Sequence, residues 1–537
     1  MVEPILRRVA PTDYSFIISK LKLNMIRGIV AKDAKCYVKG QIGPPFLTAQ
    51  QITFLFNPLG WWRKSSVLYG AKVEGATINL ILDNIDPETG ELSYESLIIE
   101  NVNATFKTDR ATKITVQNFT GDFADLTLKA NGILLPPART KRVSTKDESS
   151  EPDQGTALLN FYKFFRQFSF DTRTTVVLDF IADPYNVHDW DIKLATHSDG
   201  ISFQEHRLDS FDLKAHFKGS TGELLLNVEG LNLQKMPVEK LQAWITINEM
   251  CIIIRSISGI AGNGTRRGPY KLNGRYDMKT HIYTGKARSG FDPNATTDLL
   301  KEFDLVHQAN AIRDFKFETD LPVVSGHLIG KAFDKSWFKM IGVAQFENAT
   351  YSDVFVRSAK SSIYFDISDY HSLMANTPIH ITRPEGYLNG HMLMNFNNET
   401  LDFNCESTLH PMAIAQAIGP FMTEIVENID FQGPVRIVGS GTAGYEDLEK
   451  TDLELTLEAR NAGTLGFIAE EVSGKLRVTG TMVDLTDIKG NIYGGPFSAI
   501  AAVYPVGPES NVFYEVTGQV QNASFEQILA ALEQKQA

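Results

Sequence analysis

The stretch between residues 472 and 532 decides the predicted fold. It reads VSGKLRVTG (472–480), MVDLTDIKGNIYGGPFSAIAAVY (482–504) and NVFYEVTGQV (511–520), and it ends in a short helical run at 525–532. Apolar and polar residues alternate, and Gly or Asp marks the turns, which predicts β-strands with one buried face. The pair Gly494-Gly495 suits a tight turn because glycine tolerates positive φ.

This stretch also resembles the C-terminal region of AsmA-like proteins. The segment DIKGNIYGGPF (487–497) and the closing FEQIL helix (525–529) carry the likeness, and near the start PFLTAQQI (45–52) and GAKVEGATINL (70–80) are similar to the first strands of that family. AsmA-like proteins are β-rich envelope proteins of Gram-negative bacteria, related in shape to bridge-like lipid transfer proteins. The resemblance implies a periplasmic, inner-membrane-associated protein that acts in outer-membrane biogenesis and homeostasis.

Composition narrows the function classes. The net charge of −12 argues against a nucleic-acid partner, which would require a basic face. The three cysteines, Cys36, Cys251 and Cys405, lie too far apart in sequence to suggest a metal site or a disulfide framework. The chain contains 33 Phe, which suits either extensive apolar strand faces or a thick sandwich core. We therefore predict a β-rich protein with no cofactor and no metal.

Contact with a membrane would have to come from local features. The chain has no apolar run of about 18 residues, so no transmembrane helix is predicted. Arg7-Arg8 is not followed by an apolar core, so no signal peptide is predicted. Both points depart from the AsmA-like pattern, in which an anchor usually precedes the first strands. Trp61 and Trp62, beside Arg63 and Lys64, suit an interfacial membrane contact or a turn that caps the sheet.

Four regions are expected along the chain: an N-terminal β region (1–135), a loop (136–156), a helix with a middle β region (157–290), and repeated helix-β units with the C-terminal region (291–537). The loop has almost no apolar content, which predicts disorder. In the helix predicted over 157–168, Phe161 and Phe165 share a stripe with Leu158 and Phe168. This stripe suits a cap on the sheet or a membrane-surface helix. A helical turn is predicted over 237–244.

An internal repeat is predicted in the last region. Asp292-Pro293 opens one helix and His410-Pro411 opens another, about 118 residues later. Proline suits the first helical turn because its missing N–H has no partner there. Strand-like runs follow each helix, at 312–317 and 321–326 in the first copy and at 429–431 and 433–439 in the second. This pattern predicts a repeated β-rich layer with a helix in each copy.

The cleanest strand, 452–459, has one apolar face and one polar face. Such sheets need a cover for the apolar face, either protein or ligand. The predicted fold is therefore mainly β: an elongated, curved antiparallel sheet, a taco-like half-barrel with a hydrophobic groove and a few short capping helices. The candidate lipid-groove residues, each of which could instead be ordinary core, are Leu453, Leu455, Leu457, Leu476, Val478, Val512, Tyr514 and Val516.

No catalytic pattern stands out. Residues 259–265 are glycine-rich but lack the Lys of a phosphate-binding loop, and a hairpin connection explains them. His188, Asp189 and Asp191, with His197 and His206 downstream, could be metal ligands, form an acid/base pair or lie on the surface. We expect a non-enzymatic protein that holds or conducts phospholipid or another acyl-chain lipid, with a membrane surface or a membrane-anchored protein as partner. The alternatives are a structural or adhesive protein with a closed core, and a polysaccharide-active enzyme with two converging carboxylates.

Overall fold

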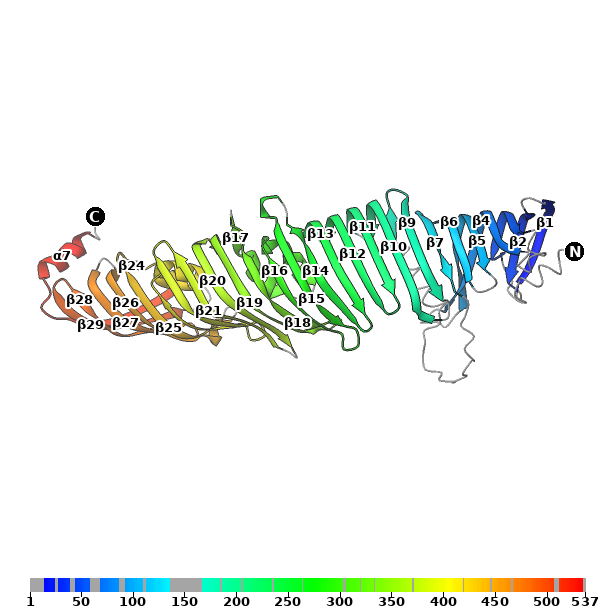
Figure 1. Ribbon diagram of the computed structural model, residues 1–537. Helices are drawn as coiled ribbons and strands as arrows, with labels where there is room; N and C mark the ends of the chain where they lie inside the picture. Colours follow the sequence, from blue (N-terminus) through cyan, green and yellow to red (C-terminus); the bar gives the residue numbers. More distant parts are fainter. Residues whose placement is uncertain are drawn as a thin grey trace, which may run out of the picture. The chain divides into compact units, whose positions relative to one another are not determined.

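The computed structural model divides into two compact units, which we describe separately (Figure 1). Unit 1 comprises residues 1–233 and 238–257, and unit 2 comprises residues 234–237 and 258–537. The boundary falls inside the region predicted as 157–290. The residues that the structure describes are 14–24, 28–38, 44–57, 68–85, 92–109, 113–135, 167–183, 186–203, 206–233, 236–262, 264–302, 306–318, 320–332, 334–368, 371–418, 420–444, 447–464, 467–506 and 511–534.

Unit 1 consists of β-strands that pair mostly with their neighbours in sequence. All of the described pairings are antiparallel except that of β7 with β9, which is parallel. The strands are β1 (Tyr14–Asn24), β2 (Gly28–Val38), β3 (Leu47–Phe56), β4 (Leu68–Ile85), β5 (Leu92–Asp109), β6 (Lys113–Phe123), β7 (Leu126–Leu134), β8 (Phe168–Phe170), β9 (Thr174–Asp183), β10 (Asn186–Phe203), β11 (His206–Lys218), β12 (Thr221–Leu233) and β13 (Met236–Asn248), with β14 (Cys251–Ala261) at the boundary.

Unit 2 is also an antiparallel sheet, with short helices inserted at two points. Its strands are β15 (Gly268–Asp277), β16 (Ile282–Ser289), β17 (Phe315–Phe317), β18 (Val323–Lys331), β19 (Asp334–Tyr351), β20 (Val354–Ser368), β21 (His371–Arg383), β22 (Gly386–Asn395), β23 (Thr400–Ser407), β24 (Ile429–Phe431), β25 (Val435–Gly444), β26 (Asp452–Thr464), β27 (Phe467–Thr479), β28 (Met482–Ile492), β29 (Gly495–Val506) and β30 (Asn511–Val520). The helices are η1 (Gly264–Arg266), η2 (Pro293–Thr296), α3 (Thr297–Glu302), α4 (Val306–Arg313), α5 (Pro411–Ile418), α6 (Pro420–Val426), η3 (Leu448–Lys450) and α7 (Phe525–Gln534).

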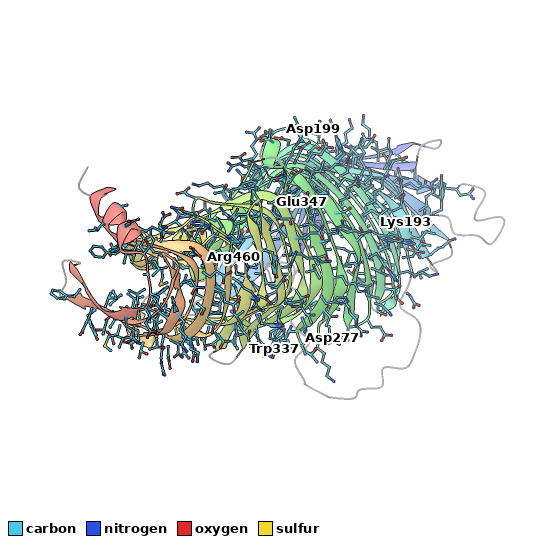
Figure 2. All side chains as sticks on the ribbon, turned by 90° about the vertical axis from the view of Figure 1, so that its left-hand side faces the viewer. Lys193, Asp199, Asp277, Trp337, Glu347 and Arg460 are labelled. Carbon is cyan, nitrogen blue, oxygen red and sulfur yellow. The ribbon has the colours of Figure 1, made fainter. Side chains whose placement is uncertain are left out.

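The predicted fold class is therefore confirmed: the protein is mainly β, built from curved, open antiparallel sheet with a few short helices. Figure 2 shows the strands bending, with charged side chains such as Asp199 on the outside of the bend. The helical turn predicted over 237–244 is wrong, because these residues belong to strand β13. Pro237 is the second residue of β13, near the start of a strand where proline is tolerated, and its carbonyl accepts the Gly262 amide.

One pattern of strand pairing occurs three times in the structure. Strands β8, β17 and β24 each have three residues, and each pairs with the last residues of a long strand, namely β10, β19 and β26. Just before this pairing, each long strand has a residue with positive φ: Gly200 at 76°, Asn348 at 49° and Asn461 at 47°. Such residues act as bulges that bend a strand. Each long strand thus changes its pairing partner at a bent corner.

Pairs of glycines allow adjacent strands of unit 2 to approach closely. Gly274 lies opposite Gly285, and Gly326 lies opposite Gly342. A Cβ at Gly342 would lie 2.3 Å from the Ser325 carbonyl oxygen and 2.9 Å from the Gly326 Cα, so the backbone would have to move. At Gly474 the nearest atom would be 3.5 Å away, an ordinary contact.

We therefore expect Gly342→Ala to destabilise the protein by about 1–3 kcal/mol, because a methyl group is forced against backbone atoms. Gly474→Ala is the matched control and should change stability by less than about 0.5 kcal/mol. Thermal unfolding followed by circular dichroism measures both. Equal melting temperatures for the two variants would show that the Gly326–Gly342 contact is not tight.

Candidate lipid-binding face

The strands of unit 1 from β9 to β12 have one apolar face. Register aligns Leu178 with Leu194, Leu194 with Ala215, and Ala215 with Leu224. A neighbouring row runs from Val176 through Thr196 and Leu213 to Leu226 in the same way. Ala215 in the first row is buried, and the larger apolar side chains of both rows are half-buried. These leucines thus remain partly accessible, on a face where Thr196 is the one polar residue of the two rows.

The opposite face of the same strands is charged. It carries Asp179, Lys193, Lys214 and His216, all exposed. His197 contacts Asp212 at 2.8 Å, and this hydrogen bond raises the pKa of the exposed histidine. His216 pairs with Asp191 at 2.9 Å. Asp191, considered from sequence as part of an acid/base pair, is thus hydrogen-bonded to a histidine on the charged face.

Unit 2 has the same two-sided character across many more strands. One row on its apolar face runs through Leu272, Ala287, Gly326, Gly342, Ile363, Asn376, Met392, Phe403, Gly441, Leu453, Val478, Val483 and Val503, with each residue opposite the next. Asn376 alone is polar, and its buried Oδ1 has no hydrogen-bond partner. At about 4.8 Å per strand, this row crosses roughly 60 Å of sheet.

Methionines line the apolar face between the two helical insertions. Met340 lies opposite Phe365, Phe365 opposite Met374, and Met374 opposite Met394. The three methionines are half-buried. Methionine is flexible and polarisable, so this section can adapt its shape to what lies against it.

Two half-buried tyrosines lie on the same face. Tyr270 and Tyr283 belong to β15 and β16, in the same alternation as Leu272 and Ala287. Burial raises the pKa of both phenols above the ordinary value, because the charged phenolate is disfavoured in a poorly hydrated site.

Helices α5 and α6 cover another section of the unit 2 apolar face. Ile414 of α5 packs on the cluster of Val435, Ile437, Ala459 and Ala462, and also beside Ile379, Leu388 and Leu409. Met422 of α6 packs on the cluster formed by Leu453, Val478, Val483 and Val503. These eleven apolar residues of strand and loop are at most 9% exposed, so protein already fills this section.

Small side chains fill the apolar face at the start of unit 1. Ala31, Ala34, Ala49 and Ala76 form a cluster with Ile52, Val73 and Val102, and none is more than 9% exposed. The strands that form this cluster and its neighbour β6 each contain a residue with positive φ: Asp33 in β2, Gly75 in β4, Asn101 in β5 and Asn118 in β6. Because the strands bend and the side chains are short, this section of the apolar face is filled by its own side chains.

The sequence-predicted groove residues fall into three groups. Leu453 and Val478 are buried at 7% and 1% exposure, while Leu455, Leu457 and Leu476 pack half-buried against the same clusters. Val516 pairs with Ala501 but is 66% exposed. Val512 and Tyr514 pair with Pro505 and Val503 in register. The membrane-contact candidates Trp61, Trp62, Phe161 and Phe165 lie outside the described residues, as does the loop at 136–156.

None of the half-buried leucines of β9–β12 or the three methionines of unit 2 is among the sequence-predicted groove residues. Leu178, Leu194 and Met340 were available from period-two alternation in residues 176–180, 192–196 and 338–342. The alternation marks a face as apolar but carries no information on which part of that face a helix covers. That information comes only from the packing of α5 and α6.

A shallow hollow of about 600 Å³ lies where β15, β16, β18, β19 and β20 run side by side. Its lining includes Lys286, His327 and Lys339, and Lys339 pairs with Asp366 at 3.0 Å. These side chains alternate with Ala287, Leu328 and Met340, so they belong to the charged face and not to the apolar one.

Among the residues that the structure describes, no three or more His, Cys, Asp or Glu side chains are grouped so that they could hold a metal ion. None of the described helices is long and apolar enough to span a membrane. Comparisons of the chain with family models, curated proteins and solved structures give no match in any of the three.

Proposed function

We propose that the protein holds and conducts acyl-chain lipids along the accessible apolar faces of its sheets, without bond chemistry. The observation that carries the proposal is the contrast across one layer of sheet in β9–β12: half-buried leucines lie on one side, and exposed charged side chains lie on the other. Apolar side chains in this setting gain from a cover that is itself apolar. Phospholipid supplies such a cover, with its head group left in water.

The energetics favour acyl chains strongly. Each buried methylene contributes roughly 0.8 kcal/mol, so a chain of about sixteen carbons gains enough to leave water. A bilayer core of about 30 Å contains two leaflets, so one chain extends about 15 Å. The unit 2 row of roughly 60 Å is therefore long enough for more than one lipid, even with α5 and α6 covering part of it.

The likeness of residues 45–52, 70–80 and 487–497 to AsmA-like proteins supports the same function and a place in the Gram-negative envelope. On this proposal the protein is periplasmic, associates with the inner membrane, and serves outer-membrane biogenesis by passive sliding of lipids. Its partners are lipid and a membrane surface or a membrane-anchored protein.

Gentle purification followed by lipid extraction and native mass spectrometry tests the proposal. We expect phospholipid to co-purify, with more than one molecule per chain. A protein with a sealed structural or adhesive core would carry none, so recovery of lipid-free protein from phospholipid-rich cells would contradict the proposal.

A further inference from the structure

The shallow hollow on the charged face of unit 2 lies among basic side chains. Three rows of this face cross β15, β16, β18 and β19, with each residue opposite the next: Lys271, Arg288, Ser325 and Val343 in the first row, Asn273, Lys286, His327 and Ile341 in the second, and Arg275, Thr284, Ile329 and Lys339 in the third. The second and third rows line the hollow, and the first row runs beside it. We call the three rows the basic patch. They contain no carboxylate, although the whole chain carries a net charge of −12.

The strand register places basic side chains of the patch directly against one another. Lys271 lies opposite Arg288, and Lys286 lies opposite His327. All four are exposed, and among the described residues no carboxylate forms an ion pair with Lys271, Lys286 or Arg288. Like charges that face each other across two strands destabilise the pairing. The sheet itself therefore gains nothing from this arrangement, whereas a bound anion would be stabilised by it.

Basic residues on another part of the charged face of unit 2 are matched with carboxylates. Arg436 lies opposite Glu458, with 3.5 Å between Nη1 and Oε2. Arg460 lies opposite Glu471, with 3.4 Å between Nη2 and Oε1. These pairs have the cross-strand arrangement that stabilises a sheet. The excess of positive charge is thus a property of the basic patch and not of this face as a whole.

A carboxylate beside the hollow is already paired. Asp366 of β20 lies opposite Lys339, and its Oδ2 is 3.0 Å from the Lys339 Nζ. The same oxygen accepts a hydrogen bond from the Tyr364 hydroxyl at 2.6 Å. Asp366 is only 9% exposed. It therefore holds Lys339 and Tyr364 in place and presents little negative charge to an anion that enters the hollow.

The hollow has the size and the lining of a small-molecule site. Its volume of about 600 Å³ lies within the range of roughly 300–1,000 Å³ that is typical of ligand pockets. Its lining includes Ile341 and Tyr364, which are 60% and 37% exposed, so an apolar and aromatic surface lies beside the cations. Lys and Arg bind phosphate oxygens through charge-assisted hydrogen bonds. A ligand that carries both phosphates and a ring would contact both kinds of surface.

We propose that the basic patch binds a water-soluble organic phosphate, in which two or more phosphate groups are joined to an apolar or aromatic body. Lys286, with Lys271 and Arg288 beside it, binds the phosphates. Ile341 and Tyr364 contact the body. The site lies on the charged face of the sheet, so its occupancy does not depend on lipid bound to the apolar face.

The surroundings of the patch favour a small ligand over a membrane or a nucleic acid. Asp277 follows Arg275 by two positions on β15, and Glu347 follows Val343 by four positions on β19, so these carboxylates lie beyond opposite ends of the three rows (Figure 2). A bilayer or a nucleic acid extends past the patch and would meet both. A ligand of the size of the hollow meets neither.

Isothermal titration calorimetry of the full chain with ADP tests the proposal, because ADP joins two phosphates to an aromatic base. We expect one ADP to bind per chain. Inorganic pyrophosphate should compete for the same site with lower affinity, and adenosine, which lacks phosphate, should not bind. The double variant Lys286→Gln and Arg288→Gln should bind ADP about tenfold more weakly or worse, because charge-assisted hydrogen bonds to phosphate are lost.

The double variant Arg460→Gln and Lys475→Gln is the matched control. It removes one arginine and one lysine from the same face, but these have carboxylate partners, Glu471 at 3.4 Å and Asp487 at 3.5 Å. The net charge changes equally in both double variants, so the control should bind ADP like the wild type. The replaced side chains are all exposed, and circular dichroism establishes that each variant is folded.

Ile341→Ser tests the contact with the body of the ligand. It should weaken the binding of ADP and leave the binding of pyrophosphate unchanged, because serine removes apolar surface without changing the charge. Ile341 is 60% exposed, so the substitution leaves the core intact.

The proposal fails if the wild type binds no ADP up to millimolar concentration, if the control double variant weakens binding equally, if adenosine binds as tightly as ADP, or if Ile341→Ser leaves ADP binding unchanged. Binding of phosphatidylglycerol vesicles or of a single-stranded oligonucleotide that requires Lys286 and Arg288, and with which ADP does not compete, would assign the patch to a macromolecule instead. Lipid content of the purified protein bears on the proposed function and on none of these outcomes.

Discussion

Replacing Leu178 and Leu194 together by Asp should reduce lipid binding by at least tenfold. The two leucines lie opposite each other on the accessible apolar face of β9 and β10. A carboxylate there would have to be desolvated by a bound acyl chain, which costs several kcal/mol without a partner. The side chains are only half-buried, so the lipid-free protein can keep the carboxylates in water and remain folded.

The control is the pair Val177→Asp and Leu225→Asp on the charged face of the same sheet. Val177 and Leu225 are 39% and 43% exposed, so the number and type of substitutions match closely. Binding of a fluorescent phospholipid and the amount of co-purified lipid are measured for both variants. If the two pairs lower lipid binding equally, the apolar face is not where lipid lies.

The second large effect concerns stability. Val478 is 1% exposed and lies between Leu453 and Val483, in a cluster against which Met422 of α6 packs. Val478→Asp places a carboxylate in this cluster with no described cationic partner, and we expect a loss of about 4 kcal/mol or more. Thermal unfolding and soluble yield are the measurements.

Val516→Asp is the contrast within the same predicted groove. Because Val516 is 66% exposed, its substitution should change stability by less than about 0.5 kcal/mol. If Val478→Asp unfolded no more readily than Val516→Asp, the α6-covered section would have to be open to water. The pair therefore measures whether helices close part of the apolar face.

The alternation of apolar and polar residues predicts much of the local structure. In β26, the run from Asp452 to Ala459 places leucines on one side and charges on the other, and register in the structure keeps them there. Period two is set by the pleat of a strand, so the sequence alone predicts both the strand and its two faces. The prolines at 293 and 411 likewise marked two helical insertions in advance, because proline suits a first helical turn.

Only the tertiary structure decides which apolar residues are core and which remain accessible. Leu453 and Leu194 have the same local pattern, yet one lies in a cluster beside α6 and the other lies half-buried on its sheet. The pairing of β8 with the end of β10 also emerged only from the structure, since β8 has three residues and no distinctive pattern. Alternation determines on which side of the sheet each side chain lies. The helices that cover part of one side come from segments far away in sequence, and their contacts are not encoded in any local pattern.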